Sequence, residues 1–319
     1  MDGPDILHIG YHKTATTWLQ AEVFARLQGA RVLGGDVARR AFLSDGSFSF
    51  RPERAREILG AGQGRIILSH EGLAGHYING GMMGAFSRDI AGRLHATLPE
   101  AHVLVVIREQ RDMITSSYLQ YVRMGGSLSA RALFRPERHD RQFRKHPVKC
   151  AAFLRDHFAY DGLLGHYRRL FGAERVHVFL YEALREDPEG FLAALCRELS
   201  LDPGRVPPAP RRRNLGYGAR VLAAARLANL LTRDSLDGRS PGLPLLPGKG
   251  LKRVFDGINR VPWLSGPRVT PDRLLGRGFC AELAAHYAPH NAELAAMFDL
   301  PLGRHGYALP APVADASVA

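Results

Sequence analysis

Short apolar runs bounded by turn-forming residues recur along the first two thirds of the chain. The first run spans residues 6–9, and three more of the same kind occupy residues 65–69, 102–107 and 176–181. Short runs that are apolar throughout are typical of strands buried on both faces. Amphipathic helical patterns separate them, so we expect an α/β fold, a three-layer sandwich with a central parallel sheet flanked by helices.

Helix signals lie between and after these runs. After Thr17, apolar residues recur every four positions and predict a helix that covers the sheet, with Leu19, Val23 and Leu27 on one face. Capping residues and prolines predict later helix starts at Asp112, at Asp187–Pro188 and at Thr270–Pro271. The stretches 205–214 and 240–271 are rich in proline with arginine or glycine and predict long loops. We expect a single domain over residues 1–309 and a disordered tail over residues 310–319.

Composition and charge narrow the class of protein. Hydrophobic residues make up 45% and charged residues 23% of the 319 residues, which is typical of a folded globular chain. The net charge of +12 suits a polyanionic ligand, although a scattered arginine excess is also typical of a solvated surface. Nucleic acid is therefore not the expected partner.

The cysteines and the N-terminal sequence bear on location. Cys150, Cys196 and Cys280 are far apart and lack metal-ligand spacing, so we expect neither a disulfide framework nor a metal site. The N-terminus has no basic region followed by a long apolar run, and no stretch reaches the ~20 apolar residues that span a bilayer. These features predict a cytoplasmic protein without a transmembrane segment.

A candidate phosphate-binding loop follows the first strand. Residues 10–18 read Gly-Tyr-His-Lys-Thr-Ala-Thr-Thr-Trp, at the point where a strand turns into a helix. Unpaired N–H groups at a helix start, the charge of Lys13 and the hydroxyls of Thr14, Thr16 and Thr17 are the chemistry of phosphate binding. The loop lacks the Gly-Lys-Ser/Thr ending of a Walker A motif, which disfavours a nucleoside triphosphatase.

This loop resembles the 5′-phosphosulfate loop of the sulfotransferases that use 3′-phosphoadenosine 5′-phosphosulfate (PAPS), whose usual form is close to Tyr-Pro-Lys-Ser-Gly-Thr-Thr-Trp. His12 replaces the proline and Ala15 the glycine. The resemblance implies a sulfotransferase fold like that of the P-loop NTPases, PAPS as co-substrate and no metal. It also implies a set of donor-binding residues: His12, Lys13, Thr14, Ala15, Thr16, Thr17 and Trp18.

A second motif lies after the strand at residues 102–107. Arg108 follows that strand and Ser116 comes eight residues later, which resembles the 3′-phosphate motif of the same family. If Asp112 caps the helix, Ser116 lies about one turn inside it, and its hydroxyl can converge with the Arg108 guanidinium on one phosphate. Taken alone, Arg108 could equally form a surface ion pair. Two motifs in the family's order, each at a strand end, make a donor site the better interpretation.

Further resemblances cover the rest of the donor site. Tyr181, in a Tyr-Glu segment followed by Asp187–Pro188, corresponds to a tyrosine near the adenine in relatives, but a core tyrosine is an equal alternative. The basic run Arg211, Arg212, Arg213 and Asn214 lies where relatives carry a loop over the 3′-phosphate. We expect at least one of these arginines to bind it; a solvated basic run is the alternative.

Catalytic roles fall on three residues. Lys13 can stabilise the leaving oxygen. His70 and Glu71 follow the second predicted strand, and relatives use either a histidine or a glutamate near this point as the base. Strand alternation sends the two side chains to opposite sides, and we favour Glu71.

The sequence leaves the acceptor open. The acceptor can be a small molecule, a carbohydrate or a lipid that bears a hydroxyl or an amine. The sequence does not determine the oligomeric state either. The first alternative function is a P-loop-type nucleotide kinase or hydrolase, and the second is a binding module without enzymatic activity.

Overall fold

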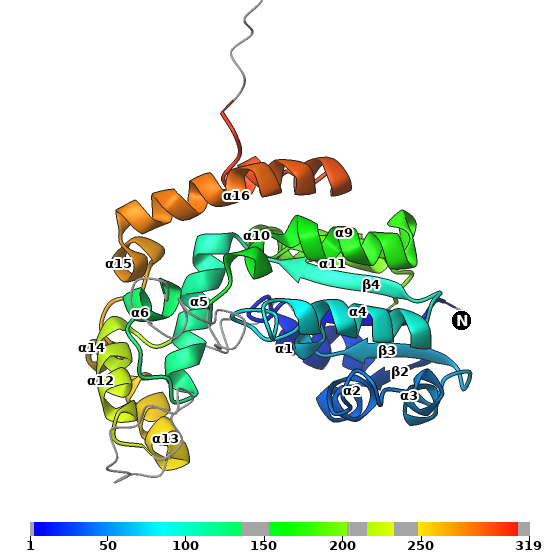
Figure 1. Cartoon of the computed structure of the whole chain (residues 1–319), viewed down its shortest axis with the longest axis horizontal. Coiled ribbons are helices and arrows are strands. Elements are labelled where there is room, and N and C mark those ends of the chain that lie inside the picture. Colours follow the sequence, from blue (N-terminus) through cyan, green and yellow to red (C-terminus); the bar gives the residue numbers. More distant parts are fainter. Residues whose placement is uncertain (1–2, 136–152, 203, 205–215, 233–247, 312–319) are drawn as a thin grey trace, which may run out of the picture.

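The computed structural model describes residues 3–135, 153–202, 204, 216–232 and 248–311. Its centre is a five-stranded parallel sheet with the strand order β2-β3-β1-β4-β5 (Figure 1). The strands are β1 (Ile6–Gly10), β2 (Ala30–Leu33), β3 (Arg65–Ser69), β4 (His102–Ile107) and β5 (Val176–Leu180). Because all five are parallel, their carboxyl ends meet at one edge of the sheet, where ligands of such folds bind.

Helices cover both faces of the sheet. Before β4 they are α1 (Thr16–Trp18), η1 (Leu19–Val23), η2 (Phe24–Arg26), α2 (Gly35–Ala38), η3 (Arg39–Leu43), α3 (Pro52–Leu59), η4 (Glu71–Ala74) and α4 (Ala85–Thr97). After β4 come α5 (Gln110–Arg123), α6 (Ala130–Phe134), η6 (Arg155–Phe158), α9 (Tyr160–Phe171), η7 (Ala173–Arg175), α10 (Tyr181–Glu186) and α11 (Pro188–Glu198). The C-terminal part holds α12 (Ala219–Asn229), α13 (Gly248–Ile258), α14 (Pro262–Ser265), α15 (Pro271–Leu275), α16 (Arg277–Phe298) and η8 (Leu302–His305).

Strand alternation divides the core in two. Ile6 of β1 faces the cluster formed with the helical segment 16–26 and with α11, whereas Leu7 and Ile9 face the larger cluster that includes α4 and α9. All five residues of β1 are fully buried, as its apolar run requires. The predicted three-layer α/β sandwich is therefore confirmed.

Most predicted strands agree with the structure to within a residue. The strands at 65–69 and 102–107 have the predicted bounds, and Tyr181 begins α10 instead of ending β5. Strand β2 was missed because it is a half-exposed edge strand that reads Ala-Arg-Val-Leu, with too little alternation to stand out. The helical segment after the loop begins at Thr16 and ends at Arg26, one residue before Leu27.

Three further predictions need correction. The N-cap of α5 is Glu109, whose carboxylate accepts from the N–H of Asp112 at 3.0 Å, so Asp112 lies inside the helix instead of capping it. The described part of the stretch 240–271 is largely helical, since α13 and α14 occupy it. The final helical region is interrupted at Gly276, whose φ of +84° separates α15 from α16.

The helices α12, α13 and α14 lie together at the far end of α5, away from the sheet (Figure 1). We call the described residues 216–232 and 248–268 the basic lobe, since they carry seven Lys or Arg residues and one acidic residue, Asp256. Residues 310 and 311 are described and lie beyond the last helical turn, while the rest of the predicted tail lies outside the described residues. The prediction of a single domain over residues 1–309 stays a prediction. In the described ranges no helix is long and apolar enough to cross a membrane.

Candidate active site at the carboxyl edge of the sheet

The loop of residues 10–18, called the donor loop below, leaves the central strand at the carboxyl edge. Hydrogen bonds inside the loop stabilise its conformation. The hydroxyls of Thr14 and Thr16 both donate to the carbonyl of Tyr11, at 2.6 Å and 3.4 Å. Both threonines are buried, whereas Thr17 is exposed. The Thr14 and Thr16 hydroxyls therefore hold the loop, and any donation by these residues to a phosphate falls to their backbone N–H groups.

Two positions of the donor loop have left-handed backbone conformations. Lys13 and Ala15 both have φ of 65°. For a residue with a Cβ atom this region is strained by about 1 kcal/mol, whereas glycine adopts it freely. The family's glycine thus corresponds to the conformation that Ala15 adopts here.

Lys13 lies among charges from three elements. Its ammonium donates a hydrogen bond to Oε1 of Gln120 on α5 at 3.1 Å. Burial lowers the pKa of Lys13 below its usual range, the neighbouring Arg123 and Arg108 lower it further, and the carboxylate of Glu71 opposes them. The lysine therefore lies between two guanidinium groups and the candidate base.

One face of α5 lines this site. Asp112, Ser116 and Gln120 recur every four residues, so they form a stripe along the helix. Asp112 Oδ2 lies 3.6 Å from Arg108 Nη2 at one end of the stripe, and Gln120 binds Lys13 at the other. Ser116 lies between them and is half-buried, nearly two turns inside the helix because α5 begins at Gln110.

Arg108 and Tyr181 form a second unit of the site. The guanidinium carbon of Arg108 lies 4.9 Å from the centroid of the Tyr181 ring, within cation–π distance. The Arg108 side chain is 12% exposed, and within the described residues its buried Nε has no hydrogen-bond partner. A buried donor without a partner is a place where an anionic ligand would gain a charge-assisted hydrogen bond. Tyr181 is half-buried at the start of α10, where it packs against the edge of the smaller core cluster.

The start of α5 is fixed by two buried contacts. The amide of Gln110, the residue that replaces the proline common in the family, donates to Oδ1 of Asn291 on α16 at 2.5 Å. Asn291 in turn donates to the carbonyl of Ala308 at 2.9 Å. The C-terminal segment therefore holds the helix that carries Ser116.

The structure separates the two candidate bases. Nδ1 of His70 accepts a hydrogen bond from the N–H of Gly72 at 2.9 Å, so the neutral ring carries its proton on Nε2. The opposite edge of the ring lies against α2, where a Cβ atom placed on Gly35 would come 2.6 Å from Cδ2 and 3.0 Å from Nε2. Burial, with a smaller effect of Arg39, lowers the pKa of His70 although Glu71 opposes this. His70 thus acts as a capping residue here.

Glu71 lies on the other side, against the donor loop. A Cβ atom placed on Gly10 would come within 3.1 Å of the Glu71 Cα, so the two backbones touch where β1 ends. Its carboxylate is near enough to raise the pKa of Lys13. Among the residues that the structure describes, no hydrogen bond occupies the Glu71 carboxylate, which leaves it free to accept a proton.

His12 is a neutral residue of the donor loop. Burial, with the neighbouring His157, His76, His70 and Lys13, lowers its pKa to about 3. Its ring lies 5.8 Å from that of Tyr77, centroid to centroid. The proline of the family loop is thus replaced by an uncharged imidazole. Trp18 is 7% exposed and belongs to the core beneath the loop.

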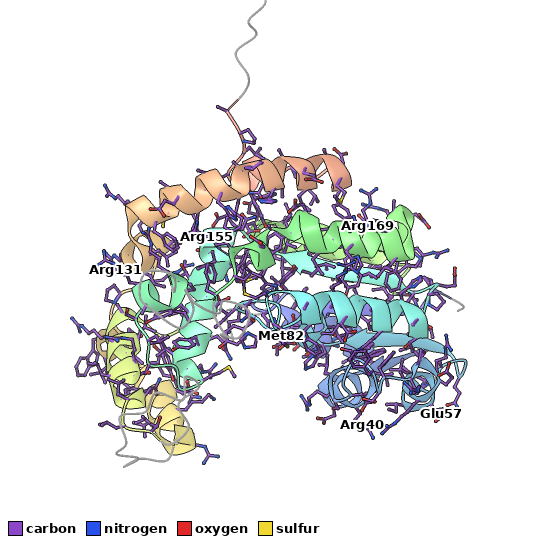
Figure 2. All side chains as sticks on the ribbon, in the orientation of Figure 1. Arg40, Glu57, Met82, Arg131, Arg155 and Arg169 are labelled. Atoms are coloured by element: carbon purple, nitrogen blue, oxygen red, sulfur yellow. The ribbon has the colours of Figure 1, made fainter. Side chains whose placement is uncertain are left out.

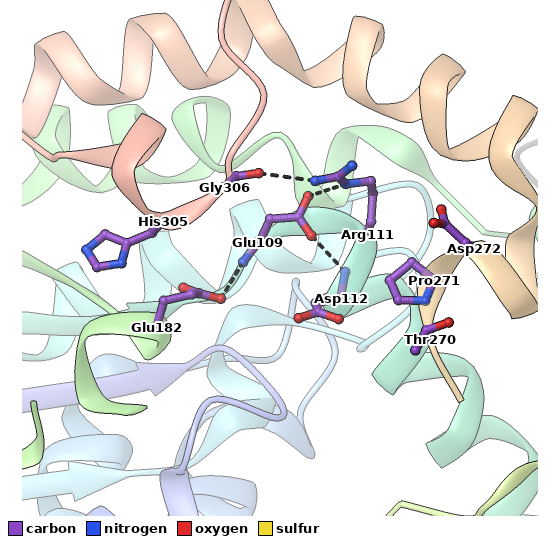
Figure 3. Close-up of a pocket in the computed structure, with 9 residues that line it drawn as sticks. All are labelled: Glu109, Arg111, Asp112, Glu182, Thr270, Pro271, Asp272, His305 and Gly306. Carbon is purple, nitrogen blue, oxygen red and sulfur yellow. Dashed lines mark hydrogen bonds and ion pairs between the residues drawn. The ribbon is translucent and has the colours of Figure 1, made fainter. Parts of the chain in front are cut away.

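A cavity of 310 Å³ lies beside the start of α5 (Figure 3). Its lining includes Asp112, which contacts Arg108, and Glu109, whose N–H donates to Glu182 Oε1 at 3.1 Å. Burial raises the pKa of Glu182, against the opposing effect of its hydrogen bonds. The carboxylates of Glu109, Asp112, Glu182 and Asp272 line this cavity together with Arg111 and His305, and Glu109 is already paired with Arg111 at 2.7 Å.

Several predicted site residues lie outside the described part of the chain. These are Arg211, Arg212, Arg213 and Asn214, the candidates for the 3′-phosphate loop. Within the described residues, no group of three His, Cys, Asp or Glu side chains could hold a metal ion. Gln120, Arg123 and the role of Asp112 were missed from sequence; the four-residue spacing from Asp112 through Ser116 to Gln120 is the signal that could have revealed them.

The arrangement defines a class: an α/β protein with the cationic side chains of Lys13, Arg108 and Arg123 near the carboxyl edge of a parallel sheet, and the carboxylate of Glu71 beside them. Residues 86–203 match the model of the sulfotransferase family, a segment that contains Arg108, Ser116 and Tyr181 but not the donor loop. Comparison with curated proteins found no match.

Comparison with solved structures bears on the fold. The chain is similar to a sulfotransferase from Alicyclobacillus acidocaldarius, at 17% identity over 96% of this chain and 99% of that one, with a TM-score of 0.53. It also matches mouse sulfotransferase SULT7A1 complexed with PAP, at 15% identity over 63% of this chain and 61% of that one, with a TM-score of 0.38. The first of these likenesses shows the fold. The resemblance predicted from the motifs is confirmed to this extent: residues 86–203 match the sulfotransferase family, and the chain has the fold of a sulfotransferase structure.

Proposed function

We propose that the protein transfers a sulfuryl group from PAPS to a hydroxyl or amine acceptor. The observation that carries this proposal is the convergence of Lys13 with the stripe Asp112, Ser116 and Gln120, at the end of which lies Arg108. Lys13 belongs to a 5′-phosphosulfate loop by resemblance, and Arg108 with Ser116 to a 3′-phosphate motif. Their closeness in space supports one ligand with both groups.

The donor fits the residues present. The Nε of Arg108 is a buried donor without a partner in the described residues, and the Tyr181 ring under the guanidinium offers an apolar face for a base. Arg108 and Ser116 would hold the 3′-phosphate, and the donor loop with Lys13 the phosphosulfate. When bound, the donor supplies the sulfuryl group and a phosphate leaving group.

Lys13 and Glu71 would have different roles in sulfuryl transfer. As the bond between sulfur and the bridging phosphate oxygen breaks, Lys13 offsets the charge that develops on that oxygen. The acceptor oxygen or nitrogen bonds to sulfur and its proton passes to the carboxylate of Glu71, whose Cα lies against the end of β1 beside the loop. Glu71 and Lys13 follow the ends of the adjacent strands β3 and β1, so both groups are held in position before the reaction.

A thermal-shift comparison tests the donor class. We expect adenosine 3′,5′-bisphosphate to raise the melting temperature more than adenosine 5′-phosphate or ATP with magnesium, since only the first fills both anchors. A preference for ATP would favour a P-loop kinase or hydrolase instead. The acceptor then follows from incubation with PAPS and cell extracts, read as products that gain the mass of one sulfuryl group. The predicted cytoplasmic location stays a prediction.

A further inference from the structure

The exposed face of α12 in the basic lobe is unusually apolar. The buried side of this helix carries Val221, Leu222, Ala225 and Asn229. The outward residues of the helix and of the turn after it are Arg220, Ala223, Ala224, Leu227 and Leu231. Leu227 is 55% and Leu231 is 39% exposed. An exposed helix face with a single polar residue is typical of a surface that binds another molecule or a membrane.

Trp263, on the neighbouring helix α14, is a further exposed apolar residue of the lobe. The guanidinium of Arg220 donates to the carbonyl of Trp263 at 2.6 Å, which holds α14 beside the start of α12. The indole of Trp263 is 71% exposed, and Val254 on the neighbouring α13 is 55% exposed. Thus four of the nine large apolar side chains that are exposed in the described chain belong to this one lobe.

The same lobe is strongly basic. Its seven cationic residues are Arg220, Arg226, Lys249, Lys252, Arg253, Arg260 and Arg268. Its one acidic residue, Asp256, is already paired with Arg123 at 2.9 Å and with Lys252 at 3.4 Å. Arg253 and Arg260 are exposed. Apolar side chains that include tryptophan, surrounded by Lys and Arg, are the chemistry that binds an anionic bilayer surface.

We propose that the basic lobe docks on the surface of an anionic lipid bilayer. The outward face of α12, with Trp263 and Val254, enters the interface between headgroups and acyl chains, and the arginines contact the anionic headgroups. Through the pair of Arg123 with Asp256, the docked helix α13 is joined to the end of α5, whose Arg123 influences Lys13. The active site is thereby held close to the membrane surface.

Vesicle co-sedimentation tests this proposal. We expect the full chain to sediment with vesicles of phosphatidylcholine and phosphatidylglycerol and to stay in solution with phosphatidylcholine alone. The double variant Leu227→Ser/Trp263→Ser should bind about tenfold or more weakly, since it removes apolar area from the interface. Arg253→Glu/Arg260→Glu should abolish the preference for anionic vesicles. All four side chains are surface-exposed, and unchanged melting temperatures will show that each variant folds.

Matched controls exist elsewhere on the molecule. Phe48 lies outside the lobe and is 100% exposed, so Phe48→Ser removes an apolar group that is more exposed than Leu227 or Trp263. Arg40 and Arg169 lie away from the lobe (Figure 2), so Arg40→Glu/Arg169→Glu repeats the charge change. Neither control should alter vesicle binding.

Fluorescence gives a second readout. Trp263 is one of two tryptophans and Trp18 is buried, so a blue shift of emission on adding mixed vesicles reports insertion of Trp263. The proposal is overturned if the full chain ignores mixed vesicles, or if the controls weaken binding as much as the lobe variants. It is also wrong if only the arginine variant loses binding and no blue shift occurs, because the lobe then binds anions such as nucleic acid without insertion. Binding of adenosine 3′,5′-bisphosphate, measured on the same variants, keeps this outcome separate from the donor assignment.

Discussion

The ammonium of Lys13 donates a 3.1 Å hydrogen bond to Oε1 of Gln120, which joins the loop after the first strand to a helix more than one hundred residues later. The partner is a neutral amide, so the lysine keeps its charge uncompensated by an ion pair at this contact. An anionic donor would therefore compete well for the ammonium. Gln120 holds Lys13 in position without neutralising it.

Replacing Lys13 should remove most of the activity and leave the fold intact. Loss of one transition-state donor of this kind costs ~3 kcal/mol, about a hundredfold in rate, so Lys13→Ala should fall by that factor in kcat. Steady-state turnover with PAPS and circular-dichroism melting measure the two properties. Near-normal turnover of Lys13→Ala would contradict the assignment.

The charge of Lys13 should set the alkaline limit of activity. Burial and two arginines lower its pKa, so the proton is lost, and activity falls, at a lower pH than for an ordinary lysine. Gln120→Glu places a carboxylate on the ammonium, which favours the charged form and moves the alkaline limb of kcat/KM to higher pH. Gln120→Met, which adds no charge, is the control. A limb that stays in place in Gln120→Glu would mean that another group titrates.

Substitution of Glu71 should lower turnover much more than substitution of His70. Removal of a general base typically costs at least ~100-fold, so we expect that loss for Glu71→Gln. His70→Asn can still accept the N–H of Gly72 as a cap and should keep kcat within about threefold of the unaltered protein. Donor affinity, measured separately by calorimetry, should change little in either. The reverse order of the two losses would make His70 the base.

Ser116 should discriminate between nucleotides. Ser116→Ala loses a hydrogen bond to a charged group, about 1.5–3 kcal/mol, so affinity for adenosine 3′,5′-bisphosphate should fall by about tenfold or more. Affinity for adenosine 5′-phosphate, which lacks the 3′ group, should not change. Ser117→Ala is the control, because neighbouring helix residues face different directions. Equal losses for both nucleotides would remove Ser116 from the 3′-phosphate site.

Ala15→Gly should stabilise the donor loop. Its φ of 65° disfavours a residue with a Cβ atom, so glycine should relieve about 1 kcal/mol of strain, partly offset by the greater freedom of glycine in the unfolded chain. Thermal melting should show a small rise for Ala15→Gly and a clear drop for Ala15→Val. If Ala15→Val melts at the same temperature as the unaltered protein, the loop does not hold this backbone conformation in solution.

The sheet was predictable because β1, β3, β4 and β5 are mostly buried and read as short, mainly apolar runs. The edge strand β2 carries no such run, and α13 was hidden by the glycines and prolines around it, which predict loops locally although packing makes the segment helical. The site residues also divide into those that the sequence could predict and those that it could not. Motif residues such as Lys13 and Arg108 carry their own chemistry, whereas the tautomer of His70 depends on a hydrogen bond from Gly72 that only the folded turn creates.

The buried amide pair of Gln110 with Asn291 has a consequence for biosynthesis. The donor loop and the α5 stripe lie within the first 123 residues. The start of α5, however, is hydrogen-bonded to Asn291 of α16, which in turn is hydrogen-bonded to the carbonyl of Ala308. We therefore expect the nascent chain to gain its affinity for the donor only after residues 291–308 have left the ribosome and have packed against the start of α5.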